Sequence, residues 1–194
     1  MGVGFVGRLT EAKGPLVYLD AVEQLLTEPP VADVSFSIAG DGPLRSEIDR
    51  RSPRLSVRYL GQLGYPEEVA EYFRALDVLV VPSYTTAESE EQSPRIIIEG
   101  LMSGCFVIGS NSGAIPEMIG SFGLCVPERD GAALARSLSD VIESHSLDVS
   151  AFSGRKMAIE RYSPAAVAGQ LVEFWTKAVG CLSAEAADSG NANR

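Results

Sequence analysis

Short apolar runs alternate with stretches of helical periodicity over most of this chain. The runs predicted as buried strands are residues 3–7, 34–39, 55–60, 77–82, 105–109 and 123–126. Apolar residues at helical spacing predict amphipathic helices over residues 15–26 and 131–144. Further helices are expected at 66–76, 94–103, 149–162 and 165–182, with shorter ones ending near residue 48 and at 114–118. This alternation predicts a Rossmann-like three-layer α/β domain, a parallel sheet with helices on both faces.

The predicted domain covers residues 1–182. Hydrophobic residues make up 45% of the chain and charged residues 22%, as is usual for a globular protein. The last dozen residues, 183–194, are rich in Ala, Ser, Asn and Gly and are expected to form a disordered tail.

Charge and cysteine usage narrow the possible partners. A net charge of −10 argues against a nucleic-acid partner, and it means that local cations must hold any anionic ligand. The three cysteines lack metal-binding spacing, which indicates reduced, buried thiols in a cytoplasmic protein. The longest apolar stretch, residues 96–108, contains Glu99 and is too short to cross a bilayer, although peripheral membrane association of a longer protein stays open.

Residues 91–99 carry the first candidate chemistry. Ser93 is a suitable N-cap and Pro94 suits the first position of a helix, whose free N–H groups form an anion site. Glu91 and Glu99 bracket this helix start, eight residues apart, and two such carboxylates can accept hydrogen bonds from sugar hydroxyls. The helix macrodipole alone would also favour acidic residues here. Glu99, however, lies among apolar neighbours, where a carboxylate needs a partner.

Two strand-to-helix loops add candidate ligand contacts. The loop at residues 7–14 presents Arg8 and Lys13 after Gly7, at the carboxyl edge of the predicted sheet where α/β folds bind ligands. The turn formed by Gly40, Asp41 and Gly42 follows the second strand, and its glycines permit either a tight turn or a close approach to a ligand. No Asp-x-Asp pair occurs, so a metal site is not expected.

Taken together and in order, these segments resemble the donor-binding C-terminal domain of GT-B retaining glycosyltransferases of the glycogen-synthase-like group 4. The matching segments are 6–9 with 13–14, 38–44, 59–61, 77–83, 91–104 and 113–117. The resemblance covers roughly residues 3 to 130. It implies a nucleotide-diphosphate sugar as donor substrate, with no cofactor.

The resemblance also implies a role for each site residue. Arg8 and Lys13 match the pair that grips the donor diphosphate, and Glu99 matches the glutamate that binds the ribose. Glu91 matches the catalytic-site glutamate that faces the donor sugar. The backbone around Ser93, Pro94, Arg95 and Ile96 would meet the phosphate, and Gly7, Gly40, Asp41, Gly42 and Gly61 would support the loops. Many relatives have a glycine-rich run where this chain has residues 92–95, which adds the cation of Arg95.

What the resemblance implies for the reaction is transfer of a hexosyl group with retention and without a metal. The resemblance also implies an N-terminal domain that binds a sugar or glycan acceptor, which we expect to lie outside this sequence, so the chain alone is expected to transfer little. Two alternatives stay open: a non-catalytic nucleotide-binding or interaction domain of GT-B fold, and half of a sugar-nucleotide epimerase.

Overall fold

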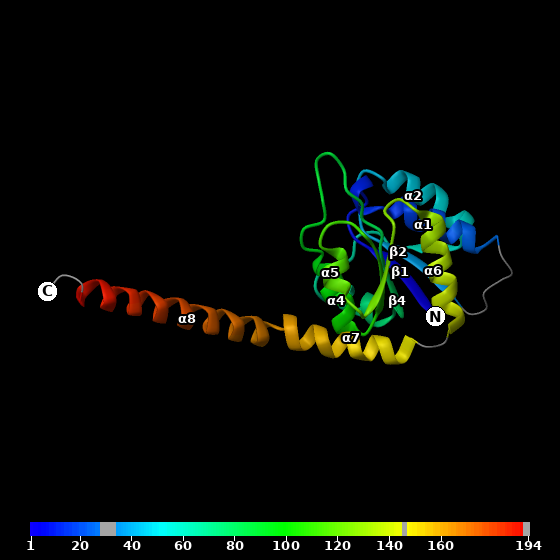
Figure 1. Ribbon diagram of the computed structural model, residues 1–194. Helices are drawn as coiled ribbons and strands as arrows, with labels where there is room; N and C mark the ends of the chain where they lie inside the picture. The colour runs from blue at the N-terminus through cyan, green and yellow to red at the C-terminus, as the bar shows by residue number, and fades with distance from the viewer. Residues whose placement is uncertain (28–33, 145–146, 192–194) are drawn as a thin grey trace. The chain divides into compact units, whose positions relative to one another are not determined.

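The computed structural model (Figure 1) describes residues 1–27, 34–144 and 147–191, and of these the side chains of residues 147–152 and 180–191 lie outside the description. The chain divides into two units, residues 1–156 and residues 157–194. The first unit holds all the strands that the structure describes and every residue of the candidate site. The second unit contains the end of α7 (Leu147–Tyr162) and α8 (Pro164–Asn191).

Six parallel strands form one sheet, as the apolar runs predict. They are β1 (Gly2–Val6), β2 (Ser35–Ala39), β3 (Val57–Tyr59), β4 (Val78–Val81), β5 (Phe106–Ser110) and β6 (Gly123–Val126). Their order across the sheet is β3-β2-β1-β4-β5-β6. The register of the two central strands pairs Val3 with Val78 and Gly4 with Leu79. Since β4 carries only buried residues, it has the uninterrupted apolar run typical of a strand covered on both faces.

Helices cover both faces of the sheet, which confirms the predicted Rossmann-like α/β layer. One face carries α1 (Pro15–Leu25), α2 (Arg45–Arg51) and α6 (Gly131–Ser144), and the other carries α3 (Glu67–Arg74), α4 (Arg95–Ser103) and α5 (Ile115–Ile119). Figure 1 shows the sheet between α4 and α5 on one side and α1 and α6 on the other. Two short 3-10 turns, η1 (Glu11–Lys13) and η2 (Ser52–Leu55), complete the first unit up to residue 144.

The core lies mainly between the sheet and α1 and α6. Tyr18 of α1 is fully buried, and its hydroxyl donates to the carbonyl of Val3 at 3.0 Å, so its one polar atom is satisfied. Leu134 and Leu138 of α6 are fully buried against the same layer. This packing fixes where α1 begins, and therefore where the loop from β1 meets the edge of the sheet.

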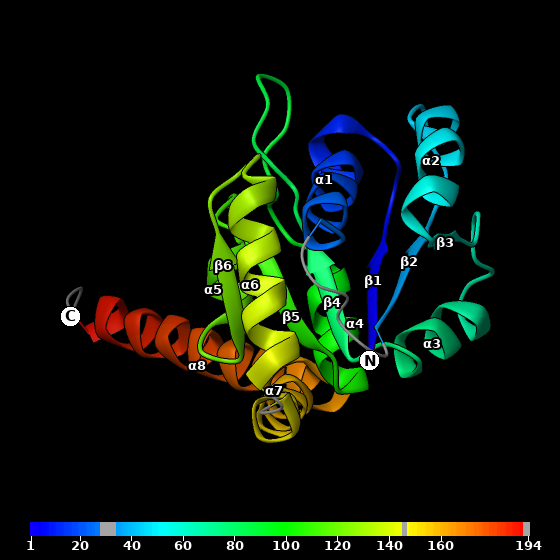
Figure 2. The same cartoon turned by 90° about the vertical axis from the view of Figure 1, so that its right-hand side faces the viewer.

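The strand order reverses between β1 and β4. From β1 the chain moves outward to β2 and β3, and it returns to pair β4 with the other side of β1. In such sheets, ligands bind in the crevice outside the carboxyl ends of the strands at this switch point. Figure 2 shows β1 and β4 near the middle of the sheet, with the long loop before α4 rising above it. The loops after β1 and β4 therefore carry the candidate site.

Most predicted boundaries agree with the structure to within about two residues. The helix predicted to end at residue 182 is an exception, because α8 is described through Asn191. The division into a domain of residues 1–182 and a tail of 183–194 stays a prediction.

Candidate functional site

The loop from β1 to α1 places its two cations differently. Arg8 lies two residues after the end of β1 and is exposed, and its guanidinium makes no hydrogen bond or ion pair within the described part of the chain. Lys13 ends η1, whose Ala12 carbonyl accepts the N–H of Tyr84 at 2.8 Å. The loop after β4 is thus tied to the loop after β1 by a backbone hydrogen bond.

The Gly40 turn packs directly onto this loop. Gly40 has φ of 136°, and a Cβ there would lie 1.8 Å from the carbonyl oxygen of Gly7, so only glycine allows this approach. The N–H of Leu9 donates to the Asp41 carbonyl at 2.9 Å, and the N–H of Gly40 donates to the Gly61 carbonyl at 2.7 Å. These bonds hold the loops after β1, β2 and β3 together at one edge of the sheet.

Lys13 and Glu91 meet across the switch point. The Lys13 ammonium donates to Oε2 of Glu91, and the two side chains are 37% and 12% exposed. Both line a cavity of about 90 Å³ together with Gly7, Ser83 and Ile96. Residues 78 positions apart in the chain are therefore brought into direct contact at the predicted ligand edge.

A second cavity adjoins the first at the end of β1. It has a volume of about 340 Å³, and its lining includes Arg8, Gly40 and Asp41. Val6 and Gly7 line both cavities, so the two hollows meet at these residues. Gln62 and Leu63, which follow Gly61 after β3, also line this second cavity. The structure thus gathers Arg8, Lys13, Glu91 and the Gly40 turn around one crevice.

The start of α4 differs from the prediction. Pro94 stands at the N-cap with ψ of 79°, so the helix begins at Arg95, and the side chain of Ser93 makes no capping bond. The Arg95 N–H donates to the Ser93 carbonyl at 2.8 Å, which turns the chain one residue later than expected. The N–H of Ile96 has no acceptor among the described residues, and Ile96 lines the smaller cavity.

Glu99 lies one turn further along α4 and is half-buried. Burial raises the pKa of its carboxyl group, and the nearby Arg95 guanidinium opposes that rise. Neither cavity includes Glu99 in its lining, nor do Ser93, Pro94, Arg95, Gly42 and Gly61 line either one. The structure therefore leaves Glu91 and Glu99 on separate elements, the first in a loop and the second on a helix.

A backbone support for Glu91 comes from the loop after β5. The Ala114 N–H donates to the Glu91 carbonyl at 2.8 Å. Gly113 has φ of 49°, and a Cβ at that position would lie 2.1 Å from the same carbonyl oxygen. The segment 113–117, one of the motifs behind the resemblance, thus contributes backbone contacts to the site, while its Glu117 side chain is exposed.

Sequence reasoning missed a clamp at the base of the loop that carries Glu91. The Glu128 carboxylate accepts the Thr85 N–H at 3.1 Å and the Thr85 hydroxyl at 2.8 Å. Arg129 donates to the Thr85 carbonyl at 3.1 Å, and its guanidinium lies 4.3 Å from the ring centre of Tyr84. No sequence motif predicts these contacts, because Thr85 and its partners Glu128 and Arg129 are polar loop residues more than 40 positions apart.

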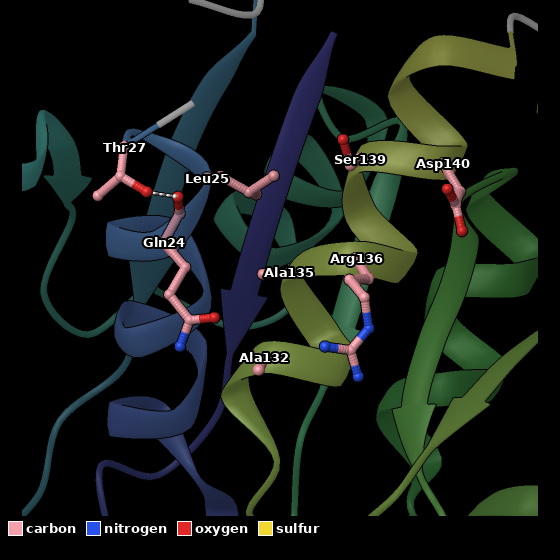
Figure 3. Close-up of a pocket in the computed structure, with 8 residues that line it drawn as sticks. All are labelled: Gln24, Leu25, Thr27, Ala132, Ala135, Arg136, Ser139 and Asp140. Atoms are coloured by element: carbon pink, nitrogen blue, oxygen red, sulfur yellow. Dashed lines mark hydrogen bonds between the residues drawn. The ribbon is translucent and has the colours of Figure 1, made fainter. Parts of the chain in front are cut away.

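Another hollow lies away from these residues, between α1 and α6 (Figure 3). Its volume is about 470 Å³, and its lining includes Gln24, Arg136 and Asp140. The Thr27 hydroxyl donates to the Gln24 carbonyl at 2.7 Å beside it. None of the predicted donor-binding residues lines this hollow, so its size alone does not mark the functional site.

The two free cysteines of the described residues differ in exposure. Cys105 is buried, and burial raises the pKa of its thiol to about 12, so it stays neutral. Cys125 is exposed, which corrects the expectation of buried thiols, because β6 is an edge strand. Within the described residues, no group of His, Cys, Asp and Glu is placed to hold a metal ion, and no helix is long and apolar enough to span a membrane.

The fold and the crevice define the class of this protein: it is a doubly wound α/β domain with a polar site at its switch point. Nucleotides bind at this place in such folds. Residues 2–144 match the sequence profile of glycosyl transferases group 1. The chain therefore belongs to this glycosyltransferase family, as the motifs predict.

Two named glycosyltransferases with similar sequences support this membership. D-inositol 3-phosphate glycosyltransferase of Streptomyces avermitilis is 34% identical over 167 residues, which are 79% of this chain and 34% of that enzyme. The enzyme of the same description from Corynebacterium efficiens is 28% identical over 91% of this chain and 42% of its own length. The chain thus spans less than half the length of these relatives.

Solved structures share the fold. The complex of Anabaena Alr3699/HepE with UDP-glucose superposes with a TM-score of 0.74 at 23% identity, over 91% of this chain and 48% of that one. The C-terminal domain of a glycosyl transferase group 1 protein from Francisella tularensis gives a TM-score of 0.70 at 22% identity, over 83% and 85% of the two chains. The predicted architecture, that of the C-terminal half of a GT-B glycosyltransferase, is confirmed.

Proposed function

We propose that this chain is the donor-binding part of a glycosyltransferase and holds a nucleotide-diphosphate sugar for transfer to an acceptor. The proposal rests on one observation: Arg8, Lys13 and Glu91 lie around one crevice at the switch point. Family membership and the UDP-glucose bound by the structurally similar Alr3699/HepE support it.

The proposed placement of the donor follows the charges of the crevice. Arg8 has no protein partner within the described residues and is free to take a phosphate through its planar fork. Lys13, on the other side of Gly7, would take the second phosphate as a point charge. The unpaired N–H of Ile96 at the start of α4 adds a donor with the favourable end of the helix dipole. The diphosphate would thus span the two adjoining cavities.

The sugar-binding and ribose-binding roles of the two glutamates are part of the same proposal. Glu91 borders the smaller cavity, where its carboxylate would accept hydroxyls of the donor sugar beside the carbon that reacts. Glu99 is half-buried on α4 and would accept the ribose hydroxyls. The loops of Gly40, Asp41, Gly42 and Gly61 would support the nucleoside side of the crevice.

We further propose transfer with retention of configuration, in which Arg8, Lys13 and α4 neutralise the charge of the departing diphosphate in place of a metal. The acceptor would be a sugar or glycan bound by a second domain, which the longer relatives have room to contain. A cytoplasmic location, with peripheral membrane association of a longer protein, is proposed on the sequence alone.

Isothermal titration with UDP, GDP and ADP tests the proposal. Each cation bound to a phosphate contributes about 1.5–3 kcal/mol, so Arg8→Ala and Lys13→Met should each weaken binding about tenfold to a hundredfold. Arg54→Ala is the matched control, since Arg54 is an exposed arginine of η2, which leads into the opposite end of β3. Unchanged affinity in both site variants, or no binding of any nucleotide, would contradict the proposal.

A further inference from the structure

The ligand-free site pairs two residues to which the proposed function gives separate ligands. Lys13 donates to Glu91, and within the described residues neither side chain has another hydrogen-bonding partner. The Glu91 side chain is only 12% exposed, so it is largely covered by protein. A carboxylate this covered depends on its one partner, because an unpaired charge in such a place is unfavourable.

A phosphate that binds Lys13 competes with Glu91 for the same ammonium group. If Glu91 keeps its bond, two anions lie on either side of one cation and repel each other at short range. If Glu91 lets go, its covered carboxylate is left without a donor. In both cases Glu91 makes diphosphate binding at Lys13 less favourable. Another hydrogen-bond donor to the Glu91 carboxylate would remove this cost.

The hexosyl group of a nucleotide-sugar can supply that donor. Its hydroxyls lie beside the terminal phosphate, and Glu91 borders the same small cavity as Lys13. A hydroxyl that donates to Glu91 replaces the lost bond from Lys13. A nucleoside diphosphate has no such hydroxyl. It also carries one more negative charge, because the electron pair of the broken bond between the sugar carbon and oxygen stays on its terminal phosphate.

We propose that the Lys13–Glu91 pair makes this site discriminate between the nucleotide-sugar and the nucleoside diphosphate that remains after transfer. The inference rests on the proposed function and adds a specificity role for Glu91 in release of the spent nucleotide. The free pair, the donor complex and the product complex differ in what donates to Glu91: Lys13, a sugar hydroxyl, or nothing. Glu91 therefore weakens binding of the product more than binding of the donor.

Titration of Glu91→Gln with a nucleoside diphosphate and with its glucose conjugate tests the inference. The neutral amide keeps the shape of the side chain but removes the repulsion, so UDP should bind about three- to tenfold more tightly. UDP-glucose should bind about three- to tenfold more weakly, because the hydroxyl loses a charged acceptor. GDP and ADP with their glucose conjugates replace the uridine pair if the wild-type chain prefers another base.

Glu90→Gln is the matched control, because it makes the same charge change one residue away on an exposed side chain. It should leave the ratio of the two affinities unchanged. Glu91→Ala provides a second variant with the same expected direction for UDP, and far-ultraviolet circular dichroism confirms that each variant is folded. A double-mutant cycle of thermal stability, with Lys13→Met and Glu91→Gln, measures the coupling energy between Lys13 and Glu91 in the absence of ligand.

The outcomes separate the two proposals. If wild-type protein binds nucleotides but Glu91→Gln changes both affinities equally, or neither, the discrimination role is wrong and the donor-binding function stands. If the stability cycle shows no coupling between Lys13 and Glu91, the pair does not form in solution and the discrimination role is again wrong. If no nucleotide or nucleotide-sugar binds to the wild-type chain, both proposals fail.

Discussion

Replacing Gly113 by alanine tests whether the loop after β5 holds Glu91 in place. Gly113 has φ of 49°, which an alanine adopts only at a cost of about 1–2 kcal/mol. The added Cβ would also lie 2.1 Å from the Glu91 carbonyl oxygen and 2.9 Å from its carbon. Both contacts are with backbone, so no side chain can rotate away. The loop itself must shift.

The shift adds to the conformational cost. Overpacking of this kind typically costs about 1–3 kcal/mol, and movement of the carbonyl weakens its 2.8 Å hydrogen bond from the Ala114 N–H. We therefore expect Gly113→Ala to lower the free energy of unfolding by about 2–5 kcal/mol. For a chain of this size, that corresponds to a fall in Tm of roughly 4–20 °C.

Urea unfolding followed by circular dichroism measures the effect, with Gly104→Ala as the control. Gly104 also has a positive φ, of 92°, but a Cβ there meets nothing within 4 Å. It should show the conformational cost of about 1–2 kcal/mol alone. Gly113→Ala should in addition weaken UDP-glucose binding, because Glu91 moves with its backbone. Equal destabilisation by the two substitutions, with donor binding intact, would refute the reasoning.

Two further predictions concern carboxyl groups with shifted pKa values. Burial raises the pKa of Glu99, so its ionised form opposes folding above that pKa, and stability rises as the pH falls through it. Glu99→Gln should therefore stabilise the free protein by about 0.5 kcal/mol at pH 7, a value reduced for solvent screening, while weakening nucleotide binding; a less stable variant in urea unfolding would contradict this. For Glu128, burial raises the pKa, but hydrogen bonds from Thr85 and Ser112 outweigh it and leave the pKa lowered. The contribution of ionised Glu128 to the free energy of unfolding is present above the unfolded-state pKa, and it is lost as the pH falls through the folded-state pKa. Glu128→Ala should thus lose less than about 1 kcal/mol at pH 7, and the difference from wild type should vanish in acid; a constant difference in pH-dependent melts would count against the clamp.

The order of strands and helices was predictable because each element is coded locally. The four residues of β4 are all apolar, and the apolar spacing of α6 predicts both of its ends, residues 131 and 144, correctly. Loop residues that need positive φ, such as Gly40, could be recognised as turn formers. That the Gly40 turn touches Gly7 could not be recognised, because this contact depends on the pairing of β1 with β2.

The start of α4 shows where local rules fail. Ser93 followed by Pro94 has the composition of a helix start, yet the carbonyl of Ser93 accepts the Arg95 N–H and its hydroxyl caps nothing. The loop from Tyr84 to Glu91 is tied to three other loops, through Ala12, Glu128 and Ala114. Those ties fix the path of the chain before Pro94, so the geometry of the helix start is set by tertiary contacts.

The same ties explain why the two glutamates of the candidate site are not equivalent. Glu99 is carried by α4, which packs on β4 and β5, so its position follows the sheet. Glu91 lies outside the helix, in a loop, and the described contacts that hold this residue are one hydrogen bond from the Ala114 N–H to its carbonyl and the bond from Lys13 to its side chain. A small movement of this loop would separate Glu91 from Lys13 without moving Glu99. If Glu99 binds the ribose as proposed, the nucleoside end of the donor would meet a rigid group. The sugar end would then meet Glu91, whose side chain can change position, as it must if its hydrogen-bond donor changes from Lys13 to a sugar hydroxyl.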